Sequence, residues 1–471
     1  MSSLLQTMEI APHKFEGLIW DERGFYQLQN ADTGRVPVRL FLTEALLADV
    51  DDQVYKQIIN ATKFPGTKLV VITPDVHLGY GVPVGSVILT DAQNGAVAMG
   101  PVGYDIGCGM ISARSSVPVA AATPAQRRAF NQGVMHRVEM GTGSQSRTLK
   151  QLTKADFERL VRGGAPAYGA MYGTTVDRGQ CERDRLPVDD DWVIPWGGRG
   201  VPERGIQQIG SLGAGNHFME LQRCVQTETL FVQVHTGSRG FGHGLATNYF
   251  DLAKAERPAE IASLDLGYFT PDSANYRAYL NAVSAGANFA IINRLVIYKA
   301  VSEAFADVFA QPLEMIYEIS HNLVQREMHP EFGEVWVHRK GATRAFPAGH
   351  PALAGTRWEK TGHPILIPGS NLDRSYVLRA SHGAVNSAYS VNHGAGRRLS
   401  RTWASKHLNL RQIEKDYRTA GVLVNMDDRV PIDEAAPCYK PASEIVACVV
   451  AADLATVEYE LEPLSSLKGN D

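Results

Sequence analysis

A chain of 471 residues, 44% of them hydrophobic and 20% charged, has the composition of an ordinary globular protein and can bury a large core. Its 46 basic and 50 acidic residues give a formal charge of −4, which excludes a globally basic nucleic-acid binder. Only a local basic face could hold nucleic acid.

The cysteines and the N-terminus bear on the compartment. Five cysteines, an odd number at scattered positions, argue against a disulfide framework and for a reducing environment. The first ten residues, MSSLLQTMEI, lack the basic start and long apolar core of a signal peptide. No run reaches the roughly 18 apolar residues of a membrane span. We therefore expect a cytoplasmic protein with no membrane partner.

The N-terminal part predicts one helix followed by strands. Apolar residues at helical spacing predict a helix over 44–59. In 69–90, β-branched runs flank a Gly/Pro-rich stretch, which predicts strand, loop and strand. Asp75 and His77 fall in that loop, where they could orient a substrate, support a metal shell or only hold a turn. A further strand is expected over 110–117.

The next part predicts helices over 125–138 and 154–168 and then a break in regular structure. Residues 180–205 are rich in charge, proline and glycine, so we expect a mobile insertion or lid there. A long helix is predicted over 277–309. Its polar and glycine interruptions exclude a membrane helix; they are Gly286, Asn288, Asn293 and Arg294.

In the second half, apolar strands end on histidines. The strand predicted over 230–234 ends on His235, and the strand over 315–319 leads into His321. Loops next to rigid strands commonly carry binding groups. A last strand is predicted over 456–461.

The loop 101–110, PVGYDIGCGM, is the most suggestive single stretch. Its three glycines let the backbone approach a ligand closely, and Asp105 and Cys108 are its strong ligand groups. Read alone, the same residues describe a tight turn around a buried structural cysteine.

Other glycine-rich loops beside apolar strands supply more ligand groups. Each histidine singly is more often a core or surface residue, but several in one context are harder to dismiss. The candidates are Asp105, Cys108, His217, His235, His321 and His393. One thiolate, several imidazoles and a carboxylate could hold two cations if the sulfur bridges them, and two-metal sites suit in-line displacement at phosphorus. Ligand softness favours zinc over manganese, but the residues alone do not select the metal.

Two basic clusters could bind phosphate. One contains Arg339 and Arg344, and the other contains Arg397 and Arg401 just after a small-residue loop. Arginine forks and loop N–H groups are natural phosphate partners, whereas a charge run is more commonly a solvated face.

Seven motifs, in order, resemble the RtcB family of GTP-dependent RNA ligases over about residues 60–471. They are PDVHLGYGVPVG, DIGCG, SLGAGNH, VHTGSRGFG, ISHN, HRKGATRAFP and HGAGRRLSR. The resemblance implies an α/β (α+β) fold of mixed β-sheets with surrounding helices, as a single large catalytic domain that is neither a Rossmann nor a P-loop fold.

The resemblance also implies an activity. The family joins an RNA 3′-phosphate or 2′,3′-cyclic phosphate end to a 5′-hydroxyl end, in tRNA splicing or RNA repair, through a histidine–GMP and then an RNA(3′)pp(5′)G intermediate. It uses GTP and manganese. The expected partners are RNA, as tRNA halves or cleaved RNA, GTP and an archease-type activator.

Site residues follow from the same resemblance. Two manganese ions would share Cys108, with Asp105 and His217 on one ion and His235 and His321 on the other. His393 would be the nucleophile that takes GMP. The nucleotide contacts would be Asn216, His217, His321, Asn322, Pro368, Gly369, Ser370, Asn371, Ser375, His393, Gly394, Ala395, Gly396 and Lys468.

Two positions need separate comment. His382 also precedes Gly-Ala, but it lacks the Gly-Arg and RxxSR continuation that follows His393. Residues 371–374, NLDR, replace the Met-Gly-type turn usual after PGS in the family, which bears on guanine recognition.

Alternatives of two other classes stay open. A metal-dependent RNA cyclic-phosphate hydrolase or phosphodiesterase would use His393 only as a ligand or acid. A non-catalytic RNA-binding scaffold would not need six intact site residues. Arg339, Arg344, Arg397 and Arg401 are predicted to form part of an RNA phosphate track.

Overall fold

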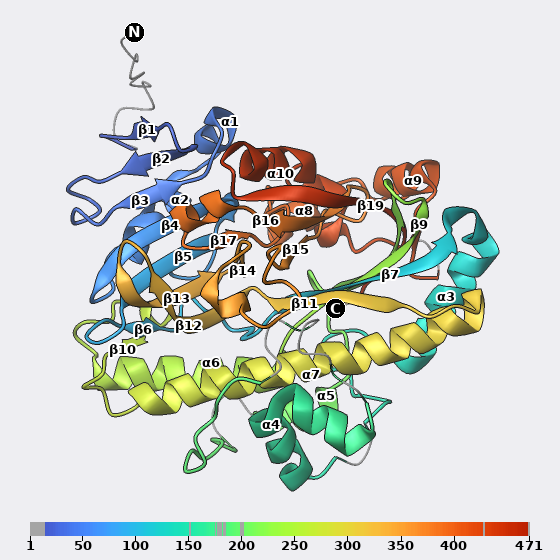
Figure 1. Cartoon of the computed structure of the whole chain (residues 1–471), viewed down its shortest axis with the longest axis horizontal. Coiled ribbons are helices and arrows are strands. Elements are labelled where there is room, and N and C mark those ends of the chain that lie inside the picture. Colours follow the sequence, from blue (N-terminus) through green and yellow to red (C-terminus); the bar gives the residue numbers. More distant parts are fainter. Residues whose placement is uncertain are drawn as a thin grey trace.

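Two large β-sheets and one long central helix organise the protein (Figure 1). The computed structural model describes residues 15–149, 152–174, 176, 181, 185–197, 202–426 and 429–469. Helices and mixed sheets together confirm the predicted α/β class.

The first sheet has seven strands and combines the N-terminal part of the chain with a later hairpin. In sheet order these are β1 (Ile19–Asp21), β2 (Phe25–Leu28), β3 (Val38–Leu40), β4 (Thr67–His77), β5 (Val84–Asp91), β13 (Gly333–Lys340) and β12 (Asn322–His329). All pairs are antiparallel except β3 with β4.

The second sheet has eight strands and carries the site. In order they are β11 (Glu314–Ser320), β7 (Gly109–Pro118), β9 (Thr229–Thr236), β8 (Phe218–Cys224), β19 (Ala455–Leu467), β16 (Ser375–Ala380) and β15 (Pro364–Ile367), with β18 (Leu423–Val424) parallel to β19. Two short ladders pair β6 (Val97–Ala98) with β10 (Tyr268–Phe269) and β14 (Ala342–Arg344) with β17 (Ser390–Asn392).

The helices pack on the sheets and on one another. They are α1 (Glu44–Ala48), α2 (Asp52–Ala61), α3 (Pro124–Arg137), α4 (Lys154–Tyr172), α5 (Arg204–Gln208), α6 (Arg239–Glu256), α7 (Tyr276–Phe309), α8 (Arg401–His407), α9 (Leu410–Ala420) and α10 (Ala442–Ala451). Short 3₁₀ segments are η1 (Val119–Ala121), η2 (Leu264–Leu266), η3 (Pro351–Leu353), η4 (His382–Ser387), η5 (Ile432–Glu434) and η6 (Ala436–Cys438).

The first sheet is buried on both faces, which explains its continuous apolar runs. On β4, Val70 and Ile72 join the large core that includes α7, whereas Leu69 and Val71 join a second core with β15, β16 and α10. Because successive side chains of a strand point to opposite faces, both sets must be apolar here.

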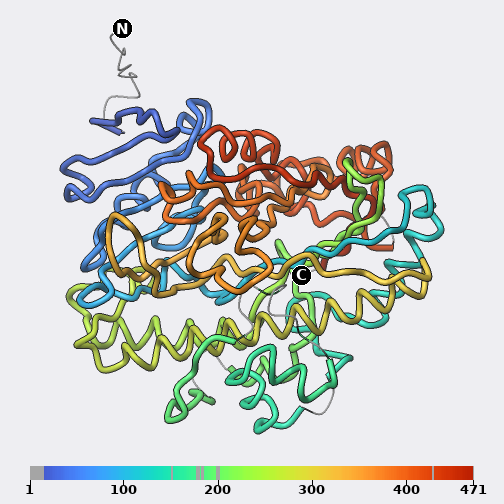
Figure 2. Tube along the Cα trace, in the orientation of Figure 1, coloured from blue at the N-terminus to red at the C-terminus, as the bar shows by residue number. Residues whose placement is uncertain are grey.

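Helix α7 is the central helix of the molecule and runs beneath both sheets in the view of Figure 1. It is long and apolar enough to cross a membrane by length and composition alone, but 89% of its most apolar window is buried inside the protein. Its hydrophobic character is therefore accounted for by packing in the core. The C-terminal end of the chain lies near the middle of the molecule (Figure 2).

Three sequence expectations change in the structure. The helix expected over 44–59 is two helices, because Asp51 caps α2 by accepting from the Val54 N–H at 2.8 Å. The loop expected around Asp75 and His77 is instead the end of the long strand β4.

The third concerns the segment predicted as a mobile insertion, part of which lies outside the described residues. Its described stretch 185–197 is irregular but anchored, with Trp192 and Ile194 buried. The Asn288 side chain accepts from Leu186 N–H at 2.8 Å and donates to the carbonyl of the same residue at 2.9 Å. This stretch is therefore packed as part of the core.

Candidate active site

Four chain segments that carry ligand groups meet at one edge of the eight-stranded sheet. Cys108 immediately precedes β7 and His217 precedes β8, whereas His235 lies at the end of β9 and His321 follows β11. These strands are antiparallel neighbours in the order β11, β7, β9, β8. The start of one strand therefore lies beside the end of the next, which brings residues distant in sequence together.

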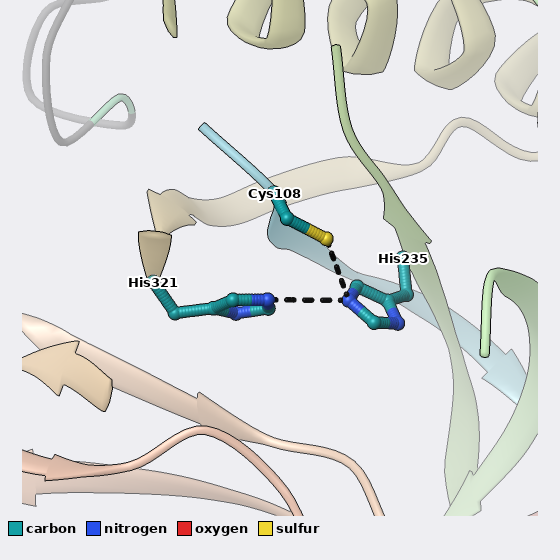
Figure 3. Close-up of side chains that lie close together, drawn as sticks. All are labelled: Cys108, His235 and His321. Carbon is teal, nitrogen blue, oxygen red and sulfur yellow. Dashed lines mark hydrogen bonds between the residues drawn. The ribbon is translucent and has the colours of Figure 1, made fainter. Parts of the chain in front are cut away.

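The side chains form two overlapping groups that share Cys108. One group is Cys108, His235 and His321 (Figure 3), and the other is Asp105, Cys108 and His217. The Cys108 Sγ lies 3.3 Å from His235 Nε2 and 3.6 Å from His217 Nε2. His235 Nε2 lies 3.3 Å from His321 Nε2, and His217 Nε2 lies 3.1 Å from an Asp105 oxygen. Cys108 thus belongs to both groups of side chains that the family resemblance assigns to the two ions.

Backbone carbonyls fix the orientation of two imidazoles. His217 Nδ1 is 3.0 Å from the Leu212 carbonyl oxygen, and His235 Nδ1 is 2.9 Å from the Asn216 carbonyl oxygen. Because a carbonyl only accepts, each Nδ1 carries the proton and each Nε2 presents its lone pair to the cluster. Lone pairs that converge at these distances are satisfied by a cation, so the donor set fits metal binding.

Burial sets the protonation of the cluster. It lowers the pKa of His235 and of His321 well below the ordinary value, helped by neighbouring histidines, so both are neutral ligands. Burial, and then the Asp105 charge, raises the pKa of the Cys108 thiol well above its usual value. Cys108 therefore keeps its proton unless a cation replaces it.

Two polar residues of α7 hold the ligand-bearing segments in place. The fully buried Arg294 donates to the Gly107 carbonyl at 2.7 Å, the Thr236 carbonyl at 2.9 Å and the Ser320 hydroxyl at 2.8 Å. These acceptors adjoin Cys108, His235 and His321, respectively. Its charge is balanced by buried Glu318, whose carboxylate accepts from Nε at 2.6 Å.

Asn293 secures the remaining loop of the cluster. Its side chain accepts from the Gly210 N–H at 2.6 Å and donates to the carbonyls of Ser211 and Gly237 at 3.2 and 3.0 Å. Two of the interruptions that exclude a membrane helix, Asn293 and Arg294, are thus supports of the ligand cluster. Sequence analysis missed this role, although a buried Arg-Asn pair in an apolar helix was its visible signal.

His393 stands beside the cluster but outside both ligand groups. It follows β17, and its ring centroid is 4.7 Å from that of His321. Its Nδ1 is 2.7 Å from the Oδ2 of Asp75, which is fully buried at the end of β4, and the same oxygen accepts from the His393 N–H at 3.2 Å. Asp75 therefore orients His393. This contact is the role observed for Asp75, for which the sequence allowed substrate orientation, support of a metal shell or a turn.

Burial alone would raise the pKa of Asp75, but the hydrogen bond and charge of His393 outweigh it, and the pKa is lowered. A carboxylate at this position holds the proton on Nδ1 and leaves Nε2 of His393 with a free lone pair. His77, two residues on, has a pKa lowered to about 4 by burial and is neutral.

Two glycines of the sequence motifs are required by this close packing. A Cβ on Gly341, in HRKGATR, would lie 2.9 Å from the His393 ring, and one on Gly396, in HGAG, would lie 2.2 Å from the Asp75 carbonyl oxygen. Both have positive φ, of 60° and 76°. Each position therefore favours glycine on two grounds.

A cavity of about 380 Å³ opens onto Cys108, His235, His321 and His393. Of the predicted nucleotide contacts, all line it except His217 and Ser375. His217 faces the metal cluster. Ser375 is fully buried behind the wall, where its hydroxyl accepts from Gly369 N–H at 3.1 Å, so it supports the loop and does not line the cavity.

Three further ionisable residues line the cavity wall; the sequence pointed to Lys340 only within the basic motif HRKGATRAFP and not at all to Glu220 and Glu434. Glu220 lies on β8, Lys340 ends β13 and Glu434 lies in η5. Burial raises the pKa of Glu220 to about 7 and lowers that of Lys340 to about 7. A carboxylate inside the apolar run HFMEL was the available signal for Glu220.

Glu434 gathers three basic side chains on the far side of the cavity. It pairs with Arg397 at 3.1 Å, with Lys468 at 3.5 Å and with Arg401. Burial opposes its ionisation, but these cations lower its pKa, so it is a carboxylate. This wall holds more positive than negative charge and can accept an anion.

Of the four arginines predicted to form an RNA phosphate track, Arg339 and Arg344 cannot serve in it because they are buried. Arg339 is buried and makes two hydrogen bonds to Glu327, at 2.6 and 2.9 Å. Arg344 is buried over the Phe346 ring and donates to Gln325 at 3.0 Å. Both serve the interior, and only Arg397 and Arg401 reach the cavity.

Of the unusual turn 371–374, only Asn371 lines the cavity, and the contacts of the turn lead away from it. Asn371 accepts from the Tyr417 hydroxyl at 2.6 Å, and Asp373 accepts from the Ala442 N–H at 2.6 Å. Arg374 pairs with Glu460 at 2.6 Å and with Glu462 at 2.7 Å. His382 is exposed in η4 and does not line this cavity.

In this mixed α/β protein, thiol, carboxylate and imidazole groups converge beside an anion-accepting cavity, and that arrangement fits the class of metal-binding proteins with a polar ligand pocket. Comparison with known proteins narrows the class. A family model described as tRNA-splicing ligase RtcB matches residues 57–469. The chain belongs to the RtcB family.

Individual relatives cover nearly the whole chain. It is 33% identical to the tRNA-splicing ligase RtcB of Thermococcus kodakarensis, over 92% of this chain and 95% of that protein. It is 34% identical to the RNA-splicing ligase RtcB of Mycobacterium tuberculosis, over 88% of this chain and all of that protein. The corresponding protein of Nanoarchaeum equitans is 30% identical, over 98% of this chain.

Proposed function

We propose that this protein is an RNA ligase that joins a 3′-phosphate or 2′,3′-cyclic phosphate end to a 5′-hydroxyl end, using GTP, in tRNA splicing or RNA repair. Family membership supports the class of reaction. The observation that carries the mechanism is the 2.7 Å contact between His393 Nδ1 and Asp75, because it leaves Nε2 free beside the metal cluster.

In the first step, the His393 Nε2 lone pair attacks the α-phosphorus of GTP. The N–P bond forms as the bond from α-phosphorus to the bridging oxygen breaks, and pyrophosphate leaves with that electron pair. Positive charge develops on the ring during the attack. The buried Asp75 carboxylate stabilises that charge through Nδ1–H.

In the second step, an oxygen of the RNA 3′-phosphate attacks the same phosphorus and the N–P bond breaks, which returns the electron pair to Nε2. The product is an RNA(3′)pp(5′)G end. In the third step, the 5′-hydroxyl attacks the RNA 3′-phosphorus, loses its proton and expels GMP. A cyclic phosphate end must first be opened by water to a 3′-phosphate.

Asp105, Cys108, His217, His235 and His321 would hold two manganese ions, with Cys108 shared. When bound, the ions would supply charge neutralisation at the reacting phosphates. The chain's own contribution is a preformed donor set in which Asp105 is a carboxylate; burial keeps His235 and His321 unprotonated, as their lowered pKa values indicate.

We propose that Glu220 and Lys468 recognise the guanine base. Guanine presents two adjacent N–H donors, at N1 and N2, and an oxygen acceptor, O6, on one edge. A carboxylate accepts from both donors and an ammonium group donates to the oxygen. Glu220 and Lys468 both line the cavity, and the Lys468 charge acts on the Glu220 carboxyl group. Arg397 and Arg401 would face RNA phosphate.

The test is covalent labelling with α-labelled GTP and manganese, followed by denaturation. His393→Ala is expected to carry no label, and His382→Ala, the matched histidine outside the cavity, is expected to retain it. The adduct should be acid-labile and stable to alkali, as a phosphoramidate is. A cyclic-phosphate hydrolase would open the ring without any adduct. Sealing of 5′-phosphate to 3′-hydroxyl ends would contradict the proposal.

Setting and partners are part of the same proposal. The five cysteines are all free and buried, which suits action in the reducing cytoplasm. The expected substrates are tRNA halves or cleaved RNA, and an archease-type protein is the expected activator. Assays with and without such a partner test the last point.

A further inference from the structure

A second cavity of about 580 Å³ adjoins the proposed nucleotide cavity at Asp105. Tyr104 and Asp105 line both cavities. A group that attacks phosphorus in line must approach from the side opposite the leaving group. Two cavities that meet at a metal-ligand loop provide two such approaches, one for the nucleotide and one for an RNA end.

An aromatic ridge crosses from one cavity to the other. The Tyr104 ring stacks on the His243 ring, with centroids 5.2 Å apart and planes inclined by 26°, and meets the Tyr80 ring edge-on at 6.0 Å. Tyr80 lines the nucleotide cavity and His243 lines the second cavity. Beneath them, buried Phe250 packs against Tyr104 with centroids 4.8 Å apart.

The outer rings of this ridge are exposed on a fixed backbone. Tyr80 is 66% exposed, and His243 is also exposed. The carbonyl of Tyr80 accepts from Lys340 Nζ at 2.7 Å, and the carbonyls on either side, of Gly79 and Gly81, accept from Gln57 and Asn60 at 2.7 and 3.0 Å. An exposed aromatic ring on a loop fixed by hydrogen bonds contributes little to the stability of the fold. Such rings commonly bind ligands by stacking.

The second cavity also has a cationic wall. Arg239 begins α6 at a φ of 49°, and its side chain donates to neutral acceptors, the Gly141 carbonyl at 3.3 Å and the Ser211 hydroxyl at 3.5 Å. In the part of the chain that the structure describes, no carboxylate hydrogen-bonds to it. Burial lowers the pKa of Arg239, although the Asp105 charge opposes this. A phosphate would satisfy this guanidinium.

We propose that the ridge formed by Tyr80, Tyr104 and His243 stacks the unpaired terminal bases of the RNA strands, and that the second cavity holds one strand end with its phosphate on Arg239. This rests on the proposed function and adds the mode of substrate recognition. Stacking tolerates any base, because every base has a π-face. The enzyme would therefore select unpaired ends and ignore their sequence.

The experiment uses the full-length protein and RNA strands with a 3′-phosphate, whose terminal nucleotide either carries its base or is abasic. RNA affinity is measured by fluorescence anisotropy, and ligation is expressed as its ratio to protein guanylylation, which needs no RNA. The variants are Tyr80→Ala and His243→Ala, with Tyr80→Phe and His243→Phe as replacements that keep a ring. Trp20→Ala, a similarly exposed aromatic residue on β1, is the matched control.

Each alanine variant should weaken binding of the natural RNA about 5- to 150-fold and lower the ratio similarly, whereas the phenylalanine variants should restore both. The abasic RNA should bind weakly to wild type and to every variant. The alanine substitutions should not weaken its binding further. Equal losses for natural and abasic RNA, or wild-type affinity in both alanine variants, would overturn the proposal. If the proposed function is wrong, the protein will form no guanylate adduct. The anisotropy measurement does not depend on that adduct, so it will still show whether the ridge binds RNA bases.

Discussion

The two halves of the active site are built on different electrostatic principles. The ligand cluster at the edge of the eight-stranded sheet is held by hydrogen bonds to backbone carbonyls and by the Arg294 guanidinium, and its His235 and His321 are neutral. The proposed nucleotide side is held by ion pairs, in which the single Glu434 carboxylate meets Arg397, Arg401 and Lys468. The ligand cluster lacks a positive charge that a cation would supply, whereas the Glu434 wall keeps an excess of positive charge that an anion would balance.

This difference predicts how each half responds to change. The cluster converges on common points, so loss of the shared ligand removes the site as a unit. On the nucleotide side each residue contributes its own contact, so losses should be graded. Substitutions in the two halves can test the distinction, beginning with the shared sulfur.

Cys108→Ala should have the largest effect. The variant should bind fewer metal ions and lose both guanylylation and ligation, because its sulfur belongs to both ligand groups. It should remain folded, since the thiol is small and Arg294 still holds the neighbouring segments. Metal analysis of the purified variant beside wild type checks this, with circular dichroism for the fold. Two full equivalents of metal in the variant would contradict a shared ligand.

Asp75→Asn should have the second-largest effect. It should lower guanylylation without changing metal binding, and so distinguish the two halves of the site. It keeps the size of the side chain but removes the charge that stabilises a cationic His393 ring. Guanylylation should fall by roughly 10²- to 10⁴-fold, in the range of general acid–base partners. Metal content should match wild type, because Asp75 is outside both ligand groups. Thr73→Val, which removes a 2.6 Å hydrogen bond to Asp75, should give a smaller loss.

Arg294→Met tests whether the cluster is preorganised by its support. The single change leaves Glu318 buried without its partner and should destabilise the fold by about 3–5 kcal/mol. Arg294→Met combined with Glu318→Gln should recover much of that stability. Metal affinity should still be about 10- to 100-fold lower in both variants, because the segments beside three ligands lose their anchor. Calorimetric metal titration with denaturant unfolding separates the two effects.

The sequence predicted the ligands better than their supports. Asp105, Cys108, His235 and His321 stand in glycine-rich loops beside apolar strands, and antiparallel pairing brings such strand ends together. Arg294 gave no comparable pattern, since one charged residue in a helix says nothing of which backbone carbonyls it will meet. Long-range hydrogen bonding depends on tertiary packing, which local patterns do not encode.

The remaining differences between the sequence predictions and the structure arise from particular hydrogen bonds and ion pairs. The pattern over 44–59 is helical throughout, but Asp51 forms a cap and divides it. The basic residues Arg339 and Arg344 read as phosphate partners because their carboxylate and amide partners, Glu327 and Gln325, lie on the neighbouring strand β12 and not in the motif itself. Residues 371–374 differ from the family turn, but their contacts face α9, α10 and β19.

Glu220→Gln should have the smallest effect of these substitutions on activity. Unlike Arg294→Met, it should increase the stability of the fold. Burial raises the Glu220 pKa from 4.5 to about 7, so the carboxyl group costs the fold nothing below about pH 4.5 and a full penalty above about pH 7. The amide removes that penalty, and the variant should be more stable than wild type at pH 8, by roughly 3 kcal/mol at most, but not at pH 4. Denaturant unfolding at the two pH values measures the difference.

The same substitution should weaken nucleotide binding, because a guanine edge with two donors meets an amide that presents a donor of its own. The expected loss in GTP affinity is about 10- to 100-fold at pH 8, the range for hydrogen bonds to a charged group. Wild-type affinity should decline as the pH falls below about 7, since the carboxyl group gains its proton, whereas the affinity of the variant should stay flat. Parallel pH curves for the two proteins would show that Glu220 does not contact the base, and the graded character of the nucleotide side would then rest on its basic residues alone.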